Sequence, residues 1–458
     1  MDKATQLGEM KVSTLLIKFS VPAIIGMIVN AVYNLVDRIY IGNGVGSLGI
    51  AATTVGFPVM LITMATSMLI GFGGNAILSI RLGQQRREDA EVILGNSLVL
   101  LIIVALGVSL PAVLVIDPLL RFFGASADVL PYAKDYMTVI LLGNIFMTLS
   151  FGMNNFIRAE GNPSVAMKTM LIGAVLNIIL DPIFIFVLNW GMSGAAFATI
   201  LSQMASMIWV LHYFLGSKSL LKIRKKNLKL HPGTVKIILT LGFPPFAMQL
   251  ASSLQNMIMN RSLVEYGGDL AMGAVGVTMS IITLILMPIF GINQGVQPII
   301  GYNYGAEKYD RVKEGIKLGI LAAVGIATFG FLITRLFPEQ LVSIFNPNDA
   351  ALIEMGKRAM AISMSFLPLV GFQVVGSHYF QAVGKPKHAA FLSLSRQFFI
   401  LIPALLIIPR FFGLNGVYAS LPFSDVLSSI ITAVFLYREM KHLKESHTRT
   451  MEKLEKAT

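Results

Sequence analysis

Two polar side chains interrupt an apolar segment in the first half of the sequence. Asn177 and Asp181 lie within residues 166–188, a run long and apolar enough to cross a bilayer. Their spacing of four residues puts the amide and the carboxyl group on one face of a helix. Pro182 follows directly and donates no backbone hydrogen bond, so a carbonyl group of the preceding turn remains available to a cation.

Other polar side chains fall at the same expected depth of the membrane. Asp37 lies near the end of the first apolar segment, and Thr199 lies near the start of the segment after Asp181. At 1.5 Å per residue, Asp37, Asp181 and Thr199 each lie roughly 8–11 Å below the same membrane face. A carboxylate in hydrocarbon is costly and usually faces a cavity or a partner, so these acids indicate an ion or substrate path.

The set Asp37, Asn177, Asp181 and Thr199 offers only oxygen ligands, which suit Na⁺ or a proton better than a transition metal. We therefore expect a cation-coupling site here. The alternative is structural: Asp37 would pair with Arg38, and Asp181 would join helices by a hydrogen bond. Accessory polar or cavity residues are expected at Asn30, Tyr33, Asn34, Glu160, Gln203, Gln255 and Asn260.

The elements that must hold these residues are membrane-spanning helices. The chain is 55% hydrophobic and only 13% charged, with a mean hydropathy of +0.72, whereas soluble domains carry about 25% charged residues. The composition predicts an all-α integral membrane protein with twelve transmembrane helices. The expected spans are 15–41, 51–80, 92–116, 131–157, 166–188, 193–215, 236–262, 273–301, 314–337, 352–380, 388–409 and 414–437.

The basic residues predict the orientation of these spans. Of the 36 Lys and Arg, 27 lie in the even-numbered connections and both tails, and six lie on the opposite side. This bias predicts a multi-pass cell-membrane protein with both termini cytoplasmic. The net charge of +12 therefore reflects topology and anionic lipid rather than nucleic acid. The N-terminus lacks the pattern of a cleaved signal peptide, and without cysteine the chain has no disulfide or thiolate site.

The sequence repeats itself at an offset of 222–223 residues. The segment Arg158–Pro163 matches Gln381–Pro386, and Trp190–Gly194 matches Phe412–Gly416. Six spans per repeat give two six-helix bundles related by a pseudo-twofold axis along the membrane normal. We expect an N-terminal lobe at 1–215, a basic cytoplasmic linker at 216–235, a C-terminal lobe at 236–440 and a charged cytoplasmic tail at 441–458.

The repeat also separates special residues from scaffold. Asp37 corresponds to Asn260, Glu160 to Val383, and Asp181 to Pro403 or Ala404. Because none of these repeat mates is acidic, the repeat indicates that the acidic residues lie only in the first half of the chain. There they would have a specialised role that the second half does not share.

Two prolines lie in helices that carry these acids. Pro22 lies inside the first span and Pro182 inside the fifth. A helix weakened by proline bends at small cost, so we expect Pro22 and Pro182 to act as hinges. The alternative for Pro22 is that it only starts a helix, where proline is tolerated.

The chain resembles the multidrug and toxic compound extrusion (MATE) transporters over essentially its whole length. The residues that carry the resemblance are Pro22, Val36-Asp37, Gly83–Asp89, Arg158–Pro163 and Asn177–Pro182, together with the twofold repeat. The resemblance implies two six-helix lobes around a central cleft and export driven by an ion gradient through alternating opening. It also implies a cation site in the first lobe at Asp37, Asn177, Asp181 and Thr199, as in the prokaryotic branch.

The leading expectation is therefore a multidrug efflux antiporter that exports amphipathic or cationic compounds in exchange for H⁺ or Na⁺. It would be a monomer without a cofactor, and no catalytic arrangement suggests an enzyme. A flippase for a lipid-linked precursor is a second reading, but only Arg38, Arg261 and Arg396 could bind its pyrophosphate. A channel or receptor would need a filter or a ligand domain, and the loops are too short for a domain.

Overall fold

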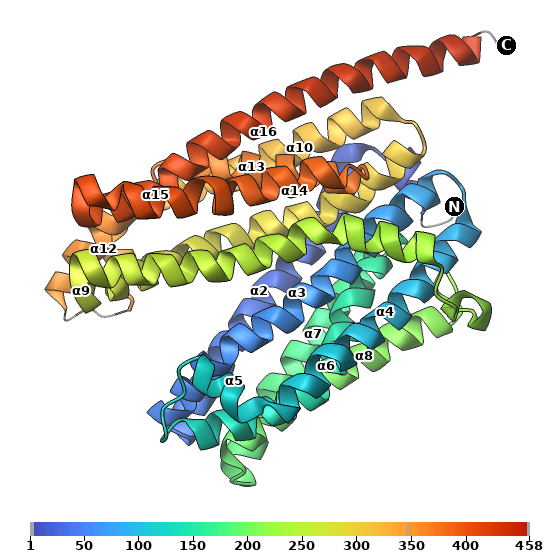
Figure 1. Cartoon of the computed structure of the whole chain (residues 1–458). Coiled ribbons are helices and arrows are strands. Elements are labelled where there is room, and N and C mark those ends of the chain that lie inside the picture. The colour runs from blue at the N-terminus through green and yellow to red at the C-terminus, as the bar shows by residue number, and fades with distance from the viewer. Residues whose placement is uncertain (1–3, 346, 348, 456–458) are drawn as a thin grey trace. The chain divides into compact units, whose positions relative to one another are not determined.

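A computed structural model describes residues 4–345, 347 and 349–455. These residues form helices joined by turns, with no strand among them (Figure 1). The fold is that of an all-α integral membrane protein, as the sequence predicts.

The first half of the chain contributes six long apolar helices. In chain order the elements are α1 (Gln6–Glu9), α2 (Val12–Gly44), α3 (Ser47–Gly83), α4 (Arg87–Leu114), α5 (Ile116–Phe122), α6 (Leu130–Ala159), α7 (Pro163–Pro182), η1 (Ile183–Val187), α8 (Gly191–Leu215) and η2 (Lys225–Leu228). The helices α2, α3, α4, α6 and α8, and α7 together with η1, are each long and apolar enough to span a membrane. They match the six spans expected from the sequence.

The second half repeats this organisation. Its elements are α9 (Pro232–Gly305), α10 (Tyr309–Leu336), α11 (Pro338–Ser343), α12 (Ala350–Ser363), α13 (Leu367–Ala382), α14 (Pro386–Leu394), η3 (Ser395–Leu401), α15 (Ile402–Ile407) and α16 (Pro409–Glu455). The label α9 covers two spans, because Gly268 with φ 66° turns the chain between Pro232–Gly268 and Leu270–Gly305. Only glycine adopts such a left-handed conformation at little cost.

The tenth expected span is broken rather than continuous. The helices α12 and α13 meet at an angle of 50°. Pro368 lies in the first turn of α13, where it disfavours a helical conformation of the residues before it. The described residues therefore hold eleven continuous spans, or twelve when the bent pair counts as one.

The chain folds into two compact units that do not coincide with its two halves. One unit contains the residues up to Glu9 and Ile25–Gln249, and the other contains Met10–Ile24 and the residues from Leu250 onward. Helix α2 therefore begins in the second unit and continues in the first, and α9 changes units in the opposite direction. Pro22 lies two residues before the change in α2, and Pro244 and Pro245 lie just before the change in α9.

Close backbone packing holds each half-helix in its unit. In the first unit, a Cβ atom added to Gly242 of α9 would lie 1.6 Å from the carbonyl oxygen of Leu69 in α3. In the second unit, a Cβ atom added to Gly295 would lie 2.8 Å from the backbone nitrogen of Ser20 in α2. Ser20 and Gly242 are repeat mates, so the two units use equivalent crossings of small residues.

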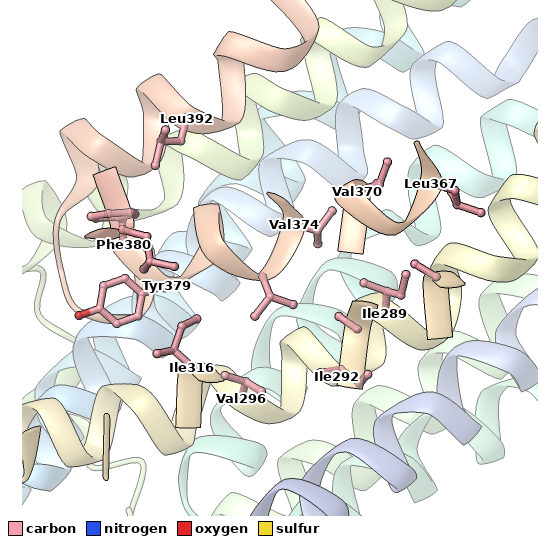
Figure 2. Close-up of a cluster of buried hydrophobic side chains, with 14 of the residues drawn as sticks. Ile289, Ile292, Val296, Ile316, Leu367, Val370, Val374, Tyr379, Phe380 and Leu392 are labelled. Atoms are coloured by element: carbon pink, nitrogen blue, oxygen red, sulfur yellow. The ribbon is translucent and has the colours of Figure 1, made fainter. Parts of the chain in front are cut away.

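Each unit has its own apolar core. In the first unit, Ile41, Met137, Leu141 and Ile185 are buried together. In the second unit, Figure 2 shows Ile289, Ile292 and Val296 of α9 beside Ile316 of α10, with Val370 and Val374 of α13 in the same cluster. These cores fix the rotation of the spans that carry the polar residues.

Candidate cation site

The centre of the site lies between α7 and α8 in the first unit. The amide nitrogen of Asn177 donates to Oδ1 of Asp181 at 3.2 Å and to Oγ1 of Thr199 at 3.4 Å. The hydroxyl of Thr199 donates to the carbonyl oxygen of Ala195, one turn earlier, at 3.0 Å. All three polar side chains are buried, and Asp181 is fully inaccessible to solvent.

The residues after Asp181 change the helix geometry. Helix α7 ends at Pro182, and the segment Ile183–Val187 continues as a π-helix. Proline removes one backbone donor, which favours such a local widening, and π segments often occur at functional sites. Asp181 thus lies where the span departs from regular α geometry.

Asp37 joins the cluster from α2. Its carboxyl group lies within hydrogen-bonding reach of the carboxyl group of Asp181. Two carboxyl groups this close repel each other unless a proton or a cation lies between them. Tyr33 of α2 and Tyr136 of α6 lie near enough to interact electrostatically with both acids.

The cluster has more acceptors than donors. Oδ1 of Asp37, Oδ1 of Asn177 and Oδ2 of Asp181 are buried and have no hydrogen-bond partner. Buried acceptors of this kind are costly unless something satisfies them. A proton shared by the two carboxyl groups, or a monovalent cation bound by these oxygens, would lower this cost, so the oxygen ligands fit H⁺ or Na⁺. No group of three His, Cys, Asp or Glu side chains that could hold a metal ion occurs in the described part of the chain.

The accessory residues fall into different places. The Asn34 amide donates to the carbonyl and side-chain oxygens of Asn30 at 2.7 and 3.1 Å, so this pair bonds within α2. Gln203 is half-buried in α8, one turn after Thr199. In the second unit, Gln255 is half-buried and Asn260 is exposed on α9.

Glu160 belongs to a separate buried cluster, after α6. Tyr213 and Ser219 each donate a hydroxyl to its carboxylate at 2.7 Å, and the backbone N–H of Leu221 donates at 2.9 Å. Burial raises the pKa of Glu160 above the usual carboxyl value, against the lowering effect of these donors. Glu160 therefore fastens the beginning of the linker to the end of α6.

The linker is held at further points on α4. Arg224 pairs with Glu91 at 2.7 Å, and the backbone N–H of His231 donates to Oδ1 of Asn96 at 2.8 Å. Asn227 is buried among these contacts. Residues 216–231 thus form a strap fixed to the first unit.

The structure corrects one inference from the repeat. Asp425 of α16 is buried in the second unit and accepts a hydrogen bond from Nε of Arg396 at 2.8 Å. The inference that acids lie only in the first half is therefore wrong. Asp425 lies inside the expected span 414–437, so the rule that drew attention to Asp181 could also have found it. Tyr136 was missed as well, because a lone tyrosine in a span gives no distinct signal.

Comparison with known proteins identifies a family for most of the chain. The MatE family profile matches residues 22–183 and 244–406, two segments whose starts differ by the offset of the internal repeat. Among curated relatives, the multidrug export protein MepA of Staphylococcus saprophyticus is 28% identical over 419 residues, which cover 92% of each chain.

Solved structures of similar proteins superpose closely. The MATE multidrug transporter DinF-BH is 42% identical with a TM-score of 0.87, covering 93% of this chain and 95% of that one. A transporter of the MOP superfamily from Pyrococcus furiosus, for which reverse polarity of the binding pocket suggests a different function, is 26% identical. Its TM-score is 0.90, with coverage of 96% and 98%.

Proposed function

The chain belongs to the MatE family of membrane transporters, and from this premise we propose that it exports amphipathic and cationic small molecules in exchange for H⁺ or Na⁺. Family members are transporters rather than enzymes, and this chain is a multi-pass multidrug export protein. We propose the coupling ion, the transport cycle and the orientation of the chain in the membrane.

The observation that carries the proposal is the acceptor-rich cluster of Asp37, Asn177, Asp181 and Thr199. Its two carboxyl groups approach each other, and one oxygen of each, together with the amide oxygen of Asn177, is buried without a hydrogen-bond donor. Asp37 and Asp181 would bind the cation, and Asn177 and Thr199 would orient Asp181. Of the two ions, the direct approach of the carboxyl groups favours a proton, because one proton between two carboxylates removes their repulsion.

Antiport follows if the cation and the cargo stabilise different conformations. Loss of the cation leaves two negative charges that repel across α2 and α7, and binding draws these helices together. Pro22 and Pro182 lie in the same two helices and would absorb the bending. Pro22 also lies next to the position where α2 changes units, which supports a hinge there. The cycle would thus alternate between inward-open and outward-open states.

The positive-inside bias supports placing both termini in the cytoplasm. The flippase reading loses support because Arg396 already pairs with Asp425 and is not a free cation for pyrophosphate. We propose a monomer, since each unit has its own apolar core.

The deciding experiment is transport in proteoliposomes with proton and Na⁺ gradients imposed separately. A fluorescent organic cation is a suitable cargo, because it belongs to the class of compounds proposed here and its movement can be followed directly. We expect uptake into inside-out vesicles under a proton gradient, and its loss in Asp181→Asn. Uptake that ignores both gradients would contradict antiport.

A further inference from the structure

The second unit contains a partly buried ion pair for which the proposed transport cycle has no role. Arg396 lies in η3 of the eleventh span, and Asp425 lies in α16, the twelfth. Their side chains are 22% and 6% exposed, and Nε of Arg396 lies 2.8 Å from Oδ1 of Asp425. A buried charge of this kind needs its partner, because removing one member leaves the other uncompensated.

The position of this pair corresponds to the cation site in the first unit. Spans eleven and twelve are the repeat mates of spans five and six, which carry Asp181 and Thr199. At the repeat offset, Asp425 corresponds to Gln203, one turn after Thr199, and Arg396 corresponds to Ala174, about one turn before Asn177. Each unit therefore has an acid in this pair of spans. In the first unit it is Asp181, on the first span of the pair, and in the second unit it is Asp425, on the second span of the pair.

The fifth and the eleventh span, which correspond in the repeat, each contain a π segment. The segment η1 directly follows Pro182, whereas η3 ends two residues before Pro403, so the two segments lie at different positions of the repeat. Beside Arg396, the amide of Gln397 donates to the hydroxyl of Ser252 in α9 at 2.7 Å, which fixes η3 against α9. Arg396 is thus held in place beside Asp425.

The two sites differ in their charge. In the first unit, two carboxyl groups and an amide leave three oxygens without donors. In the second unit, one carboxyl group faces a guanidinium. Among the described residues, Arg396 is the one charged side chain that acts electrostatically on Asp425.

We propose that Arg396 is a tethered counter-cation that permanently occupies a second cation site formed around Asp425. A covalently attached cation cannot exchange with solution, so the second unit would be excluded from ion coupling. This consequence rests on the proposed antiport, whereas the occupancy of the site by Arg396 does not. Removing the Arg396 side chain should open the site to a small free cation.

The test is chemical rescue of the full-length protein in lipid nanodiscs. Arg396→Ala should unfold at a lower temperature than the wild type, because Asp425 loses its counter-charge. Low millimolar guanidinium chloride should raise the unfolding temperature of Arg396→Ala by several degrees and then saturate. Urea, a neutral molecule of similar shape, should not, and neither compound should raise that of the wild type.

The matched control is the double variant Arg396→Ala/Asp425→Asn. It lacks both charges, so it should unfold at a higher temperature than Arg396→Ala. Guanidinium should not change the unfolding temperature of the double variant. An equal response of both variants, or no saturable response of the single variant, would overturn the proposal. If the single variant does not fold, a folded double variant supports it, and failure of both variants overturns it.

These outcomes are independent of transport. A failure of the proposed antiport would appear as wild-type uptake that depends on neither the proton nor the Na⁺ gradient, and this result leaves the unfolding measurements on Arg396 unchanged. The two ideas can therefore fail separately.

Discussion

Asp181 is the residue at which the charge of the site can change. It is fully buried, receives one hydrogen bond from Asn177, and lies within reach of Asp37. In Asp181→Asn the amide cannot bind or release a proton, so gradient-driven export of a fluorescent cation should fall by at least about tenfold, within the usual range of coupling effects. Initial export rates in proteoliposomes, at equal amounts of folded protein, measure this loss.

The control for Asp181→Asn is Asp117→Asn. Asp117 lies in the same unit and forms a half-exposed ion pair with Lys134 at 3.0 Å, so it tests the removal of an acid outside the site. Export by Asp117→Asn should stay near the wild-type rate, since exposed pairs contribute little. Normal export by Asp181→Asn would show that coupling does not pass through this cluster.

Glu160 gives a prediction about pH. Its folded-state pKa is raised by burial, so the folded protein binds a proton more tightly there than the unfolded chain does. Stability should therefore fall as pH rises from the ordinary carboxyl value of 4.5 through the raised pKa. Glu160→Gln should lessen this decline, which unfolding temperatures across that pH range would reveal. Identical pH profiles of the two proteins would assign the decline to other groups.

At the scale of elements, the sequence predicts the spans well because each one is a local apolar run. It does not predict the break between α12 and α13, since the residues around Pro368 are apolar and a proline alone does not show that a span is bent. It also missed the strap at residues 216–231, because contacts such as that between Glu160 and Ser219 join distant positions. The proximity of Asp37 to Asp181 could be expected from depth, but the contribution of Tyr136 depends on how α6 is rotated.

The crossing of α3 and α9 leads to a prediction about packing. A Cβ atom on Gly242 would overlap the Leu69 carbonyl oxygen, so Gly242→Ala should destabilise the first unit by about 1–3 kcal/mol or more. The matched control is Gly276→Ala, also in α9, where an added Cβ atom meets nothing within 4 Å. That change should be neutral or stabilising by up to about 1 kcal/mol. The unfolding temperatures of Gly242→Ala and Gly276→Ala measure this difference, and equal values would contradict the packing argument.

Helix α2 leads to a prediction about rate. Pro22→Ala restores a backbone donor inside α2 and stiffens it next to the change of units. Export should slow several-fold while the Asp37 and Asp181 cluster keeps its affinity for the cation. Stopped-flow transport and equilibrium cation titration separate these effects, and unchanged rates would remove the support for a hinge.

At the scale of the whole molecule, the orientation in the membrane can be tested cleanly because the chain contains no cysteine. Lys225→Cys in the strap should react with a membrane-impermeant maleimide only when the cytoplasmic side is exposed. Lys134→Cys, near the start of α6, should react from the opposite side. Labelling of both positions from one side would contradict the predicted topology.

The change of units within α2 and α9 has a consequence for biosynthesis. Residues 10–24 are made before Ile25–Gln249, yet the unit to which they belong is completed only by the residues from Leu250 onward. At ordinary elongation rates the synthesis of Ile25–Gln249 takes on the order of 10–50 s. During that time the first half-helix must wait in the bilayer without its final neighbours, and the first unit stays incomplete until the start of α9 is inserted. The first unit therefore cannot be completed before Gln249 has been made, and the second unit is completed only by the residues that follow.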